Sequence, residues 1–341
     1  MAEIFSFSEF FNKAGVIFDV RSPAEFSHAS IPGAVNLPLF SNQERAIIGT
    51  LYKQKGKEPA IQLGLELVGP KIASFVSQAK NLNQLGIAKI HCWRGGMRSE
   101  AMTWLLNFAG IKSIQLNGGY KAFRKWTLKQ FSQPYKFIVL GGMTGCGKTS
   151  ILQALKESGA QTIDLEFLAK HRGSTYGHLG FNPQPSNEQF ENDLAFQLYQ
   201  LDVQQPIWIE DESHCIGACH IPNSIFAQIV QAPLILIETS LEERIDRLLN
   251  EYGLTNKEDL ILASTRISKR LGSQRTRELI EAIQKNHLRD AIALVLQYYD
   301  KTYAHAITRR AQSIFTIQNT CLSPTEWSHQ LLESINSKEF L

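Results

Sequence analysis

Two glycine-rich loops with different chemistry constrain this chain most. In the first, an apolar run ends at a cysteine, and a helix is expected to open near Arg98 and Ser99; the loop comprises Cys92, Arg94, Gly95, Gly96, Met97, Arg98 and Ser99. Backbone N–H groups and a helix N-terminus in such a loop surround the sulfur and favour the thiolate at neutral pH. We predict that Cys92 is a nucleophile or carries a sulfur-like atom. The alternative is a buried structural cysteine.

The second loop fits the phosphate-binding pattern GxxxxGKT. It lies between a predicted strand at 136–140 and a predicted helix that starts at Lys148, and it comprises Gly142, Thr144, Gly145, Cys146, Gly147, Lys148, Thr149 and Ser150. Backbone N–H groups of a P-loop wrap a diphosphate. We expect Lys148 to neutralise the phosphate oxygens and Thr149 to hold Mg²⁺.

Further apolar runs predict a parallel sheet around the second loop. Strands are expected at 206–210 and 233–237, and the first leads into three acids that would bind metal through water, namely Glu210, Asp211 and Glu212. The fold class is therefore α/β, with a P-loop NTPase-like parallel-sheet domain and a helical C-terminal part. A chain of 341 residues with 43% hydrophobic content can bury two cores.

The composition and the first residues bear on the location of the protein, on the state of its cysteines and on its partners. The first residues lack a basic segment followed by an apolar run, and no stretch reaches the length of a membrane span, so a soluble cytoplasmic protein is expected. Five cysteines, an odd number, favour reduced thiols. The net charge of +3 is too small to establish a nucleic-acid partner.

Two local clusters leave alternatives open. The region 264–290 is basic, with Lys269, Arg270 and Arg275 among its cations, and suits a phosphate backbone, a solvated helix face or a lid over a small phosphorylated ligand. The run from His214 to His220 contains two histidines and two cysteines. Its cysteine spacing departs from the usual zinc knuckle, so we expect a structural turn there.

The N-terminal part resembles rhodanese domains. The resemblance rests on residues 16–26, 28–38 and 116–123, covers about residues 1–130, and puts Cys92 at the position of the sulfur-carrying cysteine. One departure is that Arg98 follows Cys92 by six residues, as in the related cell-cycle phosphatases, and the loop alone also fits tyrosine phosphatases. The longer loop indicates a tetrahedral anion as substrate, while the upstream signature favours the rhodanese-like fold.

The chain, with a rhodanese-like part followed by a P-loop part, resembles bacterial tRNA 2-selenouridine synthases, and this likeness runs from about residue 10 to 310. It rests on the block 164–174, on 184–186, 190–191, 210–213, 216–217, 221–222, 267–272 and 298–303; the block includes Asp164, Glu166, His171 and Arg172. The domains expected from it are a rhodanese-like domain over 1–131, a P-loop domain over 135–315 with the basic helical region, and a C-terminal tail over 316–341.

The resemblance implies a two-step transferase acting on the wobble uridine of tRNAs for Lys, Glu and Gln. The sulfur of a 5-substituted 2-thiouridine is first geranylated by geranyl diphosphate, and selenium from selenophosphate then displaces the S-geranyl group. A supplier of selenophosphate is an expected partner, and Lys269, Arg270 and Arg275 are expected to bind tRNA. We assign the diphosphate to the P-loop with Mg²⁺, and selenium to the Cys92 loop.

Two other functions fit the same loops. One is an ATP-dependent small-molecule kinase or NTPase fused to a rhodanese-type phosphatase. The other is a sulfur-binding regulatory protein with a structural P-loop, which is disfavoured because both loops retain their reactive residues.

Overall fold

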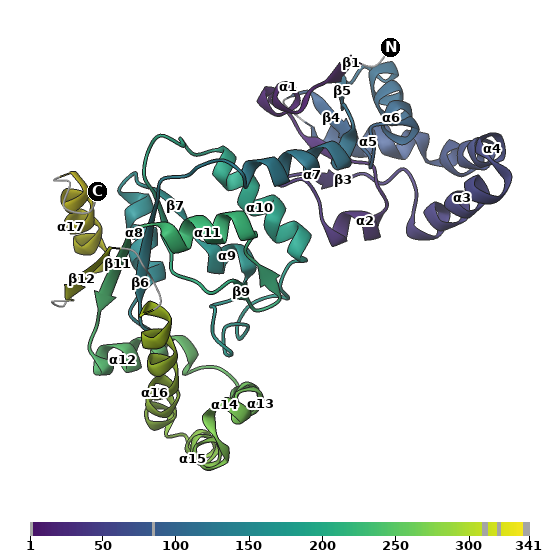
Figure 1. Ribbon diagram of the computed structural model, residues 1–341. Helices are drawn as coiled ribbons and strands as arrows, with labels where there is room; N and C mark the ends of the chain where they lie inside the picture. Colours follow the sequence, from purple (N-terminus) through teal and green to yellow (C-terminus); the bar gives the residue numbers. More distant parts are fainter. Residues whose placement is uncertain (1–2, 84–85, 309–312, 319–321, 337–341) are drawn as a thin grey trace. The chain divides into compact units, whose positions relative to one another are not determined.

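The computed structural model describes residues 3–83, 86–308, 313–318 and 322–336. The chain divides into two compact units, Met1–Gln130 and Phe131–Leu341, and each contains a parallel sheet with helices (Figure 1). The division lies just before Ser132–Pro134, where the sequence analysis placed the boundary. Within the described residues, no helix is both long and apolar enough to span a membrane.

The first unit is built on a five-stranded parallel sheet with the order β1-β5-β4-β2-β3. Apolar clusters lie around Phe18 and Ile90 and around Phe10 and Phe123. Parallel sheets need such cover because both faces are apolar. The elements are β1 Glu3–Phe5, α1 Phe7–Asn12, β2 Ile17–Asp19, α2 Pro23–His28, β3 Val35–Asn36, α3 Asn42–Lys55, α4 Lys57–Val68, the 3₁₀ turn Gly69–Lys71, α5 Ile72–Leu82, β4 Ala88–His91, α6 Met97–Phe108, β5 Ser113–Leu116 and α7 Gly119–Gln130.

A helical hairpin, formed by α3 and α4, lies between β3 and β4 along the chain. Helix α3 starts at a capping box, in which Ser41 accepts from the Glu44 backbone N–H and Glu44 accepts from that of Ser41. Gly56, with φ of 89°, ends α3 and lets the chain turn into α4. Figure 1 shows the two helices side by side. The sequence analysis predicted no feature here, because this segment carries no motif.

The second unit has a five-stranded parallel sheet with the order β12-β11-β6-β8-β7. The strands expected at 136–140, 206–210 and 233–237 are confirmed as β6, β8 and β11. The elements are β6 Phe137–Gly142, α8 Lys148–Glu157, β7 Gln161–Ile163, α9 Leu165–Ala169, α10 Asn187–Tyr199, β8 Ile207–Glu210, β9 Cys215–Ile216, β10 Cys219–His220, α11 Asn223–Gln231, β11 Leu234–Glu238, α12 Leu241–Tyr252, α13 Lys257–Arg266, α14 Ser268–Leu271, α15 Ser273–Gln284, α16 Leu288–Ile307, β12 Ile314–Gln318 and α17 Pro324–Asn336.

The segment 316–341 differs from the expected tail. Its first residues complete the edge strand β12, and α17 packs against α8. Trp327 and Leu331 are buried in the same cluster as Ile151 and Leu152 of α8. The tail interpretation was therefore wrong for the described part of this segment, because its apolar side chains cover one face of the P-loop helix.

Candidate functional site

Cys92 lies directly after β4, at the carboxyl end of the sheet of the first unit. Its thiol is buried, and Sγ lies 3.2 Å from the hydroxyl oxygen of Ser99 in the first turn of α6. Gln115 braces this contact by donating to Ser99 Oγ over 3.0 Å and to the Gly95 carbonyl over 2.6 Å. The loop packs so tightly on Gly119 that a Cβ there would lie 2.3 Å from the Cys92 carbonyl oxygen. The predicted helix start is confirmed, one residue early, at Met97.

A buried charge pair supports the strand ends next to this loop. Arg21 donates to the Asp19 carboxylate over 2.9 Å and to the Ala29 carbonyl over 2.7 Å, and its guanidinium lies 3.8 Å from the Tyr120 ring centroid. His91 Nε2 is 3.7 Å from the same carboxylate, but burial lowers the pKa of His91 and keeps the ring neutral. These groups hold the ends of β2 and β4 together, next to the start of the Cys92 loop.

Arg98, at the exit of the loop, is paired with an acid of the rhodanese-like signature. Its Nη1 lies 2.9 Å from Glu25 Oε2. Burial of Glu25 raises its pKa, but the hydrogen bond and charge of Arg98 outweigh burial, and the net effect lowers the pKa of Glu25. Glu25 is therefore ionised at neutral pH, so Arg98 is partly neutralised and fixed in place.

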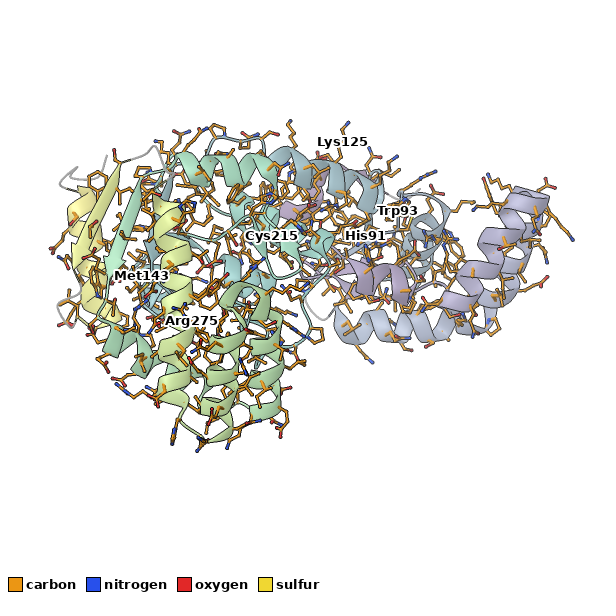
Figure 2. The ribbon with its side chains drawn as sticks, turned by 60° about the horizontal axis from the view of Figure 1, so that its bottom comes forward. His91, Trp93, Lys125, Met143, Cys215 and Arg275 are labelled. Carbon is orange, nitrogen blue, oxygen red and sulfur yellow. The ribbon has the colours of Figure 1, made fainter. Side chains whose placement is uncertain are left out.

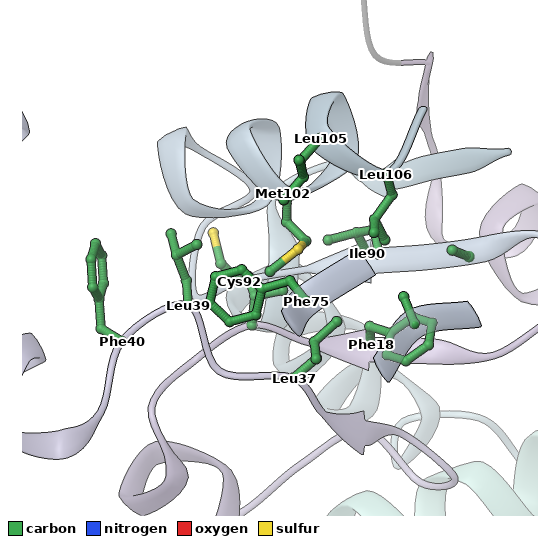
Figure 3. Close-up of a cluster of buried hydrophobic side chains, with 13 residues drawn as sticks. Phe18, Leu37, Leu39, Phe40, Phe75, Ile90, Cys92, Met102, Leu105 and Leu106 are labelled. Atoms are coloured by element: carbon green, nitrogen blue, oxygen red, sulfur yellow. The ribbon is translucent and has the colours of Figure 1, made fainter. Parts of the chain in front are cut away.

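A large cavity opens beside the Cys92 loop, with a volume of about 660 Å³. Helices α3 and α4 form one side, and the loop and the start of α6 form the other. Figure 3 shows Cys92 beside Leu39, one of the apolar residues that line the cavity. Loop residues among the lining are Cys92, Trp93, Arg94, Gly96, Met97 and Arg98.

The second predicted loop lies between β6 and α8, as a P-loop requires. Lys148 Nζ donates to the Gly142 carbonyl over 3.1 Å, so the amine folds back over the loop. Two arginines of α12 hold the outer side: Arg247 donates to the Gly145 carbonyl over 2.7 Å, and Arg244 donates to the Thr144 carbonyl over 3.3 Å. Cys146, a residue of the loop itself, is buried.

Two glutamates, Glu166 and Glu212, lie near the amine of Lys148, and Glu210 lies near both of them. Burial, together with neighbouring carboxylates, raises the pKa of Glu210, Glu212 and Glu166 above the usual glutamate range. Burial of Lys148 acts against its charge, but the Cys146 sulfur and Glu212 outweigh it, and the pKa of Lys148 is raised. Glu166 and Glu212 share a hydrogen bond, which requires a proton on one of the two carboxyls.

These groups suit Mg²⁺ held jointly with a phosphorylated ligand. Thr149 Oγ1 lies 3.4 Å from Glu166 Oε2, and Glu210 Oε2 is buried with no hydrogen-bond partner. Across the described chain, no three His, Cys, Asp or Glu side chains form a ready-made metal site. Such an arrangement is normal for Mg²⁺, which is bound by one or two carboxylates, waters and substrate phosphates.

A tyrosine near the end of α16 forms hydrogen bonds with the P-loop and with an acid that follows β8. Tyr303 accepts from the Gly142 backbone N–H over 2.8 Å and donates to Asp211 Oδ2 over 2.9 Å. On the same helix, Asp300 forms a bidentate pair with the buried Arg244, at 2.7 Å for both contacts. Helix α16 and the α12 arginines therefore fix the loop from both sides.

The remaining predicted residues fall in different places. Asp164 caps α9 by accepting from the Phe167 N–H and lies near the glutamates. Arg172 instead pairs with Glu251 and donates to the Leu179 carbonyl. His171 is buried, and its ring stacks against that of His178, with ring centroids 6.4 Å apart. Gly173, which follows Arg172, has a φ of 64°, a left-handed conformation that favours glycine.

The basic region and the His214–His220 run lie on other elements than Glu166 and Glu210. The expected helical region is confirmed as α13 to α16, and Lys269, Arg270 and Arg275 are exposed on α14 and α15 (Figure 2 labels Arg275). Residues 215–220 form the two-stranded hairpin β9–β10, in agreement with the expected turn. Burial of Cys219 raises its pKa to about 11, whereas Cys215 is exposed.

Several supporting residues were not predicted as site residues. Arg21, Glu25, Arg244, Asp300 and Tyr303 support the two loops, but no role was assigned to them. Their partners are mostly distant in the sequence; Tyr303 and Gly142 are 161 residues apart. Arg21 and Glu25 lie within the rhodanese-like signature, which is the signal that could have pointed to them.

Comparisons with known proteins agree with both halves. The family described as "tRNA 2-selenouridine synthase AAA domain" matches residues 135–332, and the rhodanese-like domain family matches residues 6–125. A tRNA 2-selenouridine synthase from Sulfurovum sp. (strain NBC37-1) is 36% identical over 334 residues, covering 87% of this chain and 90% of the relative. The chain belongs to the tRNA 2-selenouridine synthase family.

A second relative matches to a similar extent, and one solved structure matches part of the chain. A tRNA 2-selenouridine synthase from Bordetella petrii is 35% identical over 353 residues and covers 92% of each chain. Among solved structures, the N-terminal domain of a putative ATP/GTP binding protein from Clostridium difficile 630 is 40% identical, covers 37% of this chain and 99% of its own, and has a TM-score of 0.35.

Proposed function

We propose that this member of the 2-selenouridine synthase family converts wobble 2-thiouridine in tRNA to 2-selenouridine through an S-geranyl intermediate. The observation that carries the proposal is the pair of anion-binding loops in one chain, one with a buried thiol and one with a lysine surrounded by carboxylates. The substrates are the tRNAs for Lys, Glu and Gln, with geranyl diphosphate and selenophosphate as donors.

In the first step, the thiouridine sulfur attacks the allylic carbon of geranyl diphosphate. A carbon–sulfur bond forms, the carbon–oxygen bond to the diphosphate breaks, and the base loses its N3 proton. Lys148 and the N–H groups of the P-loop bind the leaving diphosphate. Thr149, Glu166 and Glu210 would hold Mg²⁺, which neutralises charge on the diphosphate.

In the second step, the selenium of selenophosphate attacks C2 of the modified base. A carbon–selenium bond forms, the carbon–sulfur bond breaks, and geranylthiol leaves; water then cleaves the selenium–phosphorus bond and releases phosphate. The Cys92 loop holds the selenium donor, with the thiol positioned by Ser99 and the loop held by Gln115. The exposed cations on α14 and α15 bind the tRNA backbone.

A reconstituted reaction tests the proposal. Purified protein is incubated with a 2-thiouridine anticodon stem-loop RNA, geranyl diphosphate and selenophosphate, and nucleosides are measured by mass spectrometry. We expect S-geranyl-2-thiouridine with the first donor alone and 2-selenouridine with both. Phosphate release from ATP without either nucleoside would instead support a kinase or NTPase fused to a phosphatase.

A further inference from the structure

The cavity beside Cys92 has no role in the two steps described so far. Resting on the proposed function, we propose that it binds the geranyl chain of the S-geranyl tRNA intermediate. The modified base then lies at the Cys92 loop, and the hydrocarbon chain extends between that loop and the α3–α4 hairpin. The first unit would thereby distinguish the geranylated base from the thiouridine that precedes it.

The lining of the cavity fits an uncharged hydrocarbon chain. Its walls are mainly aliphatic and aromatic, and its volume of about 660 Å³ lies within the range of small-molecule sites. Apolar residues that line it include Leu39, Phe40, Ile48, Ala60, Ile61 and Leu65. Within the described residues that line the cavity, there is no aspartate or glutamate.

Exposed apolar side chains on α4 point to a missing apolar occupant. Leu65 is 64% exposed and Ile61 is 38% exposed, although both line the cavity. A helix that served only to cover the sheet would bury such side chains, because their contact with water is unfavourable. A bound hydrocarbon chain would remove these surfaces from water.

The position of the thiol orients the chain. Cys92 is part of the cavity wall, and its Sγ is positioned by Ser99 at 3.2 Å. A thioether whose chain fills the cavity would therefore present its sulfur, and the base carbon attached to it, near the loop that holds selenium. With this arrangement, the geranylthiol released in the second step would also remain in an apolar site.

Among the described residues that line it, the cavity has none of the acids that would hold Mg²⁺ beside a diphosphate. Arg98 is paired with Glu25, and Arg45 lies 3.8 Å from the same carboxylate. Arg98 and Arg45 are thus partly neutralised, and the lining also contains Lys53 and Arg94. The carboxylates that suit Mg²⁺ lie around Lys148 in the second unit. We therefore assign the cavity to the chain of the thioether and not to that of geranyl diphosphate.

Binding of two modified RNAs tests this assignment. The probes are anticodon stem-loops that carry either S-geranyl-2-thiouridine or S-methyl-2-thiouridine, titrated against the full-length protein without donors. We expect the wild type to bind the geranyl RNA at least about tenfold more tightly, which corresponds to about 1.4 kcal/mol. Leu65→Trp, which fills the cavity from an exposed position, should remove this preference and leave binding of the methyl RNA unchanged.

Two further variants make the result specific. Ile61→Asp places a charge in the lining and should remove the preference in the same way. Gln62→Trp adds the same ring to the exposed surface of the same helix outside the cavity, and it should keep the preference. Thermal unfolding of each variant checks that the first unit is folded.

The outcomes separate this inference from the proposed function. Equal affinity of the wild type for both RNAs would overturn the inference, even if the same protein makes 2-selenouridine. If Leu65→Trp lost only the binding of geranyl diphosphate, this result would also overturn the inference, because the cavity would then hold the donor. If the wild type makes no 2-selenouridine, the proposed function fails, while the RNA titration still decides what the cavity binds.

Discussion

At the scale of single residues, Cys92 and Lys148 occupy comparable positions with different surroundings. Each follows a central strand of its sheet, where helix N-termini and loop N–H groups collect at one edge. The thiol contacts a hydroxyl and faces an apolar cavity, whereas the amine is surrounded by carboxylates. These surroundings suit a sulfur or selenium carrier in the first case and a diphosphate with a cation in the second.

Replacing the thiol should separate the two steps. In Cys92→Ser we expect 2-selenouridine formation to fall to background while geranylation continues, because the loop that holds the selenium donor then lacks its thiol. Mass spectrometry of the product nucleosides measures both. Cys215→Ser, which removes an exposed thiol of the second unit, is the control and should keep both steps. Normal selenation by Cys92→Ser would contradict the proposed role.

Glu210 gives a prediction for stability and pH. Its pKa is higher in the folded chain than in the unfolded chain, so the folded state binds more protons between the two values. Stability is therefore lost as pH rises above about 4.3, the usual glutamate value. Glu210→Gln should raise the free energy of unfolding at pH 8, and the gain should disappear near pH 4.

Thermal or denaturant unfolding at several pH values measures this difference. Glu157→Gln, at an exposed position at the end of α8, is the control and should show no gain that depends on pH. A gain for Glu210→Gln that is the same at pH 4 and pH 8 would show that the carboxyl is not destabilising the folded unit by its charge.

At the scale of elements, β6 and α8 form the phosphate-binding loop, while α12 and α16 hold it. Arg244, Arg247 and Tyr303 bond to loop atoms from outside and inside, so the loop is preorganised for a ligand. Met143, labelled in Figure 2, is exposed at the tip of this loop.

Removing the amine of the P-loop should block the first step. Lys148→Ala should weaken binding of geranyl diphosphate by roughly 10- to 100-fold, the size expected when a charged hydrogen bond is removed. Selenation from thiouridine should fail as well, because it needs the geranylated product. Pre-geranylated RNA should restore selenation. Lys156→Ala, at an exposed position on the same helix, should behave as wild type.

If pre-geranylated RNA does not restore selenation in folded Lys148→Ala, the P-loop serves both steps or another ligand. Nucleoside mass spectrometry with each donor supplied separately distinguishes these cases.

The sequence predicted those elements whose signal is contiguous along the chain. The P-loop and the Cys92 loop each lie in a short segment between a strand and a helix, so glycine spacing alone places them. The pair between Arg244 and Asp300 depends on how α12 packs on α16, which no local pattern encodes. The α3–α4 hairpin was missed because its helices form a cavity wall without any motif.

At the scale of the whole molecule, the proposed tRNA surface is a set of exposed cations on α14 and α15. Arg289, in contrast, pairs with Glu242 and Asp246, and Lys285 pairs with Glu281. These two are therefore less available to a phosphate backbone than Lys269, Arg270 and Arg275.

Replacing Lys269, Arg270 and Arg275 by Ala should weaken binding of all substrate tRNAs alike. The slope of log affinity against log salt should decrease by about one unit for each tRNA phosphate that the variant no longer neutralises. Geranyl diphosphate binding should hardly change. A lid over a small phosphorylated ligand predicts the reverse, with weaker diphosphate binding and an unchanged tRNA slope.

A triple variant with the same change in charge is the control. Lys121, Lys125 and Lys129 are exposed on α7 of the first unit, and their replacement by Ala should leave the slope unchanged. Equal effects of both triples would mean that tRNA responds only to total charge.

The order of elements along the chain affects how the protein is made. The P-loop helix α8 is synthesised early in the second unit, but the face formed by Ile151 and Leu152 is covered by Trp327 and Leu331 of α17. A nascent chain that stops before α17 therefore carries an uncovered apolar helix directly behind Lys148. Exposed apolar surface of this kind promotes aggregation, so we expect an unfinished second unit to need chaperones until α17 has been made.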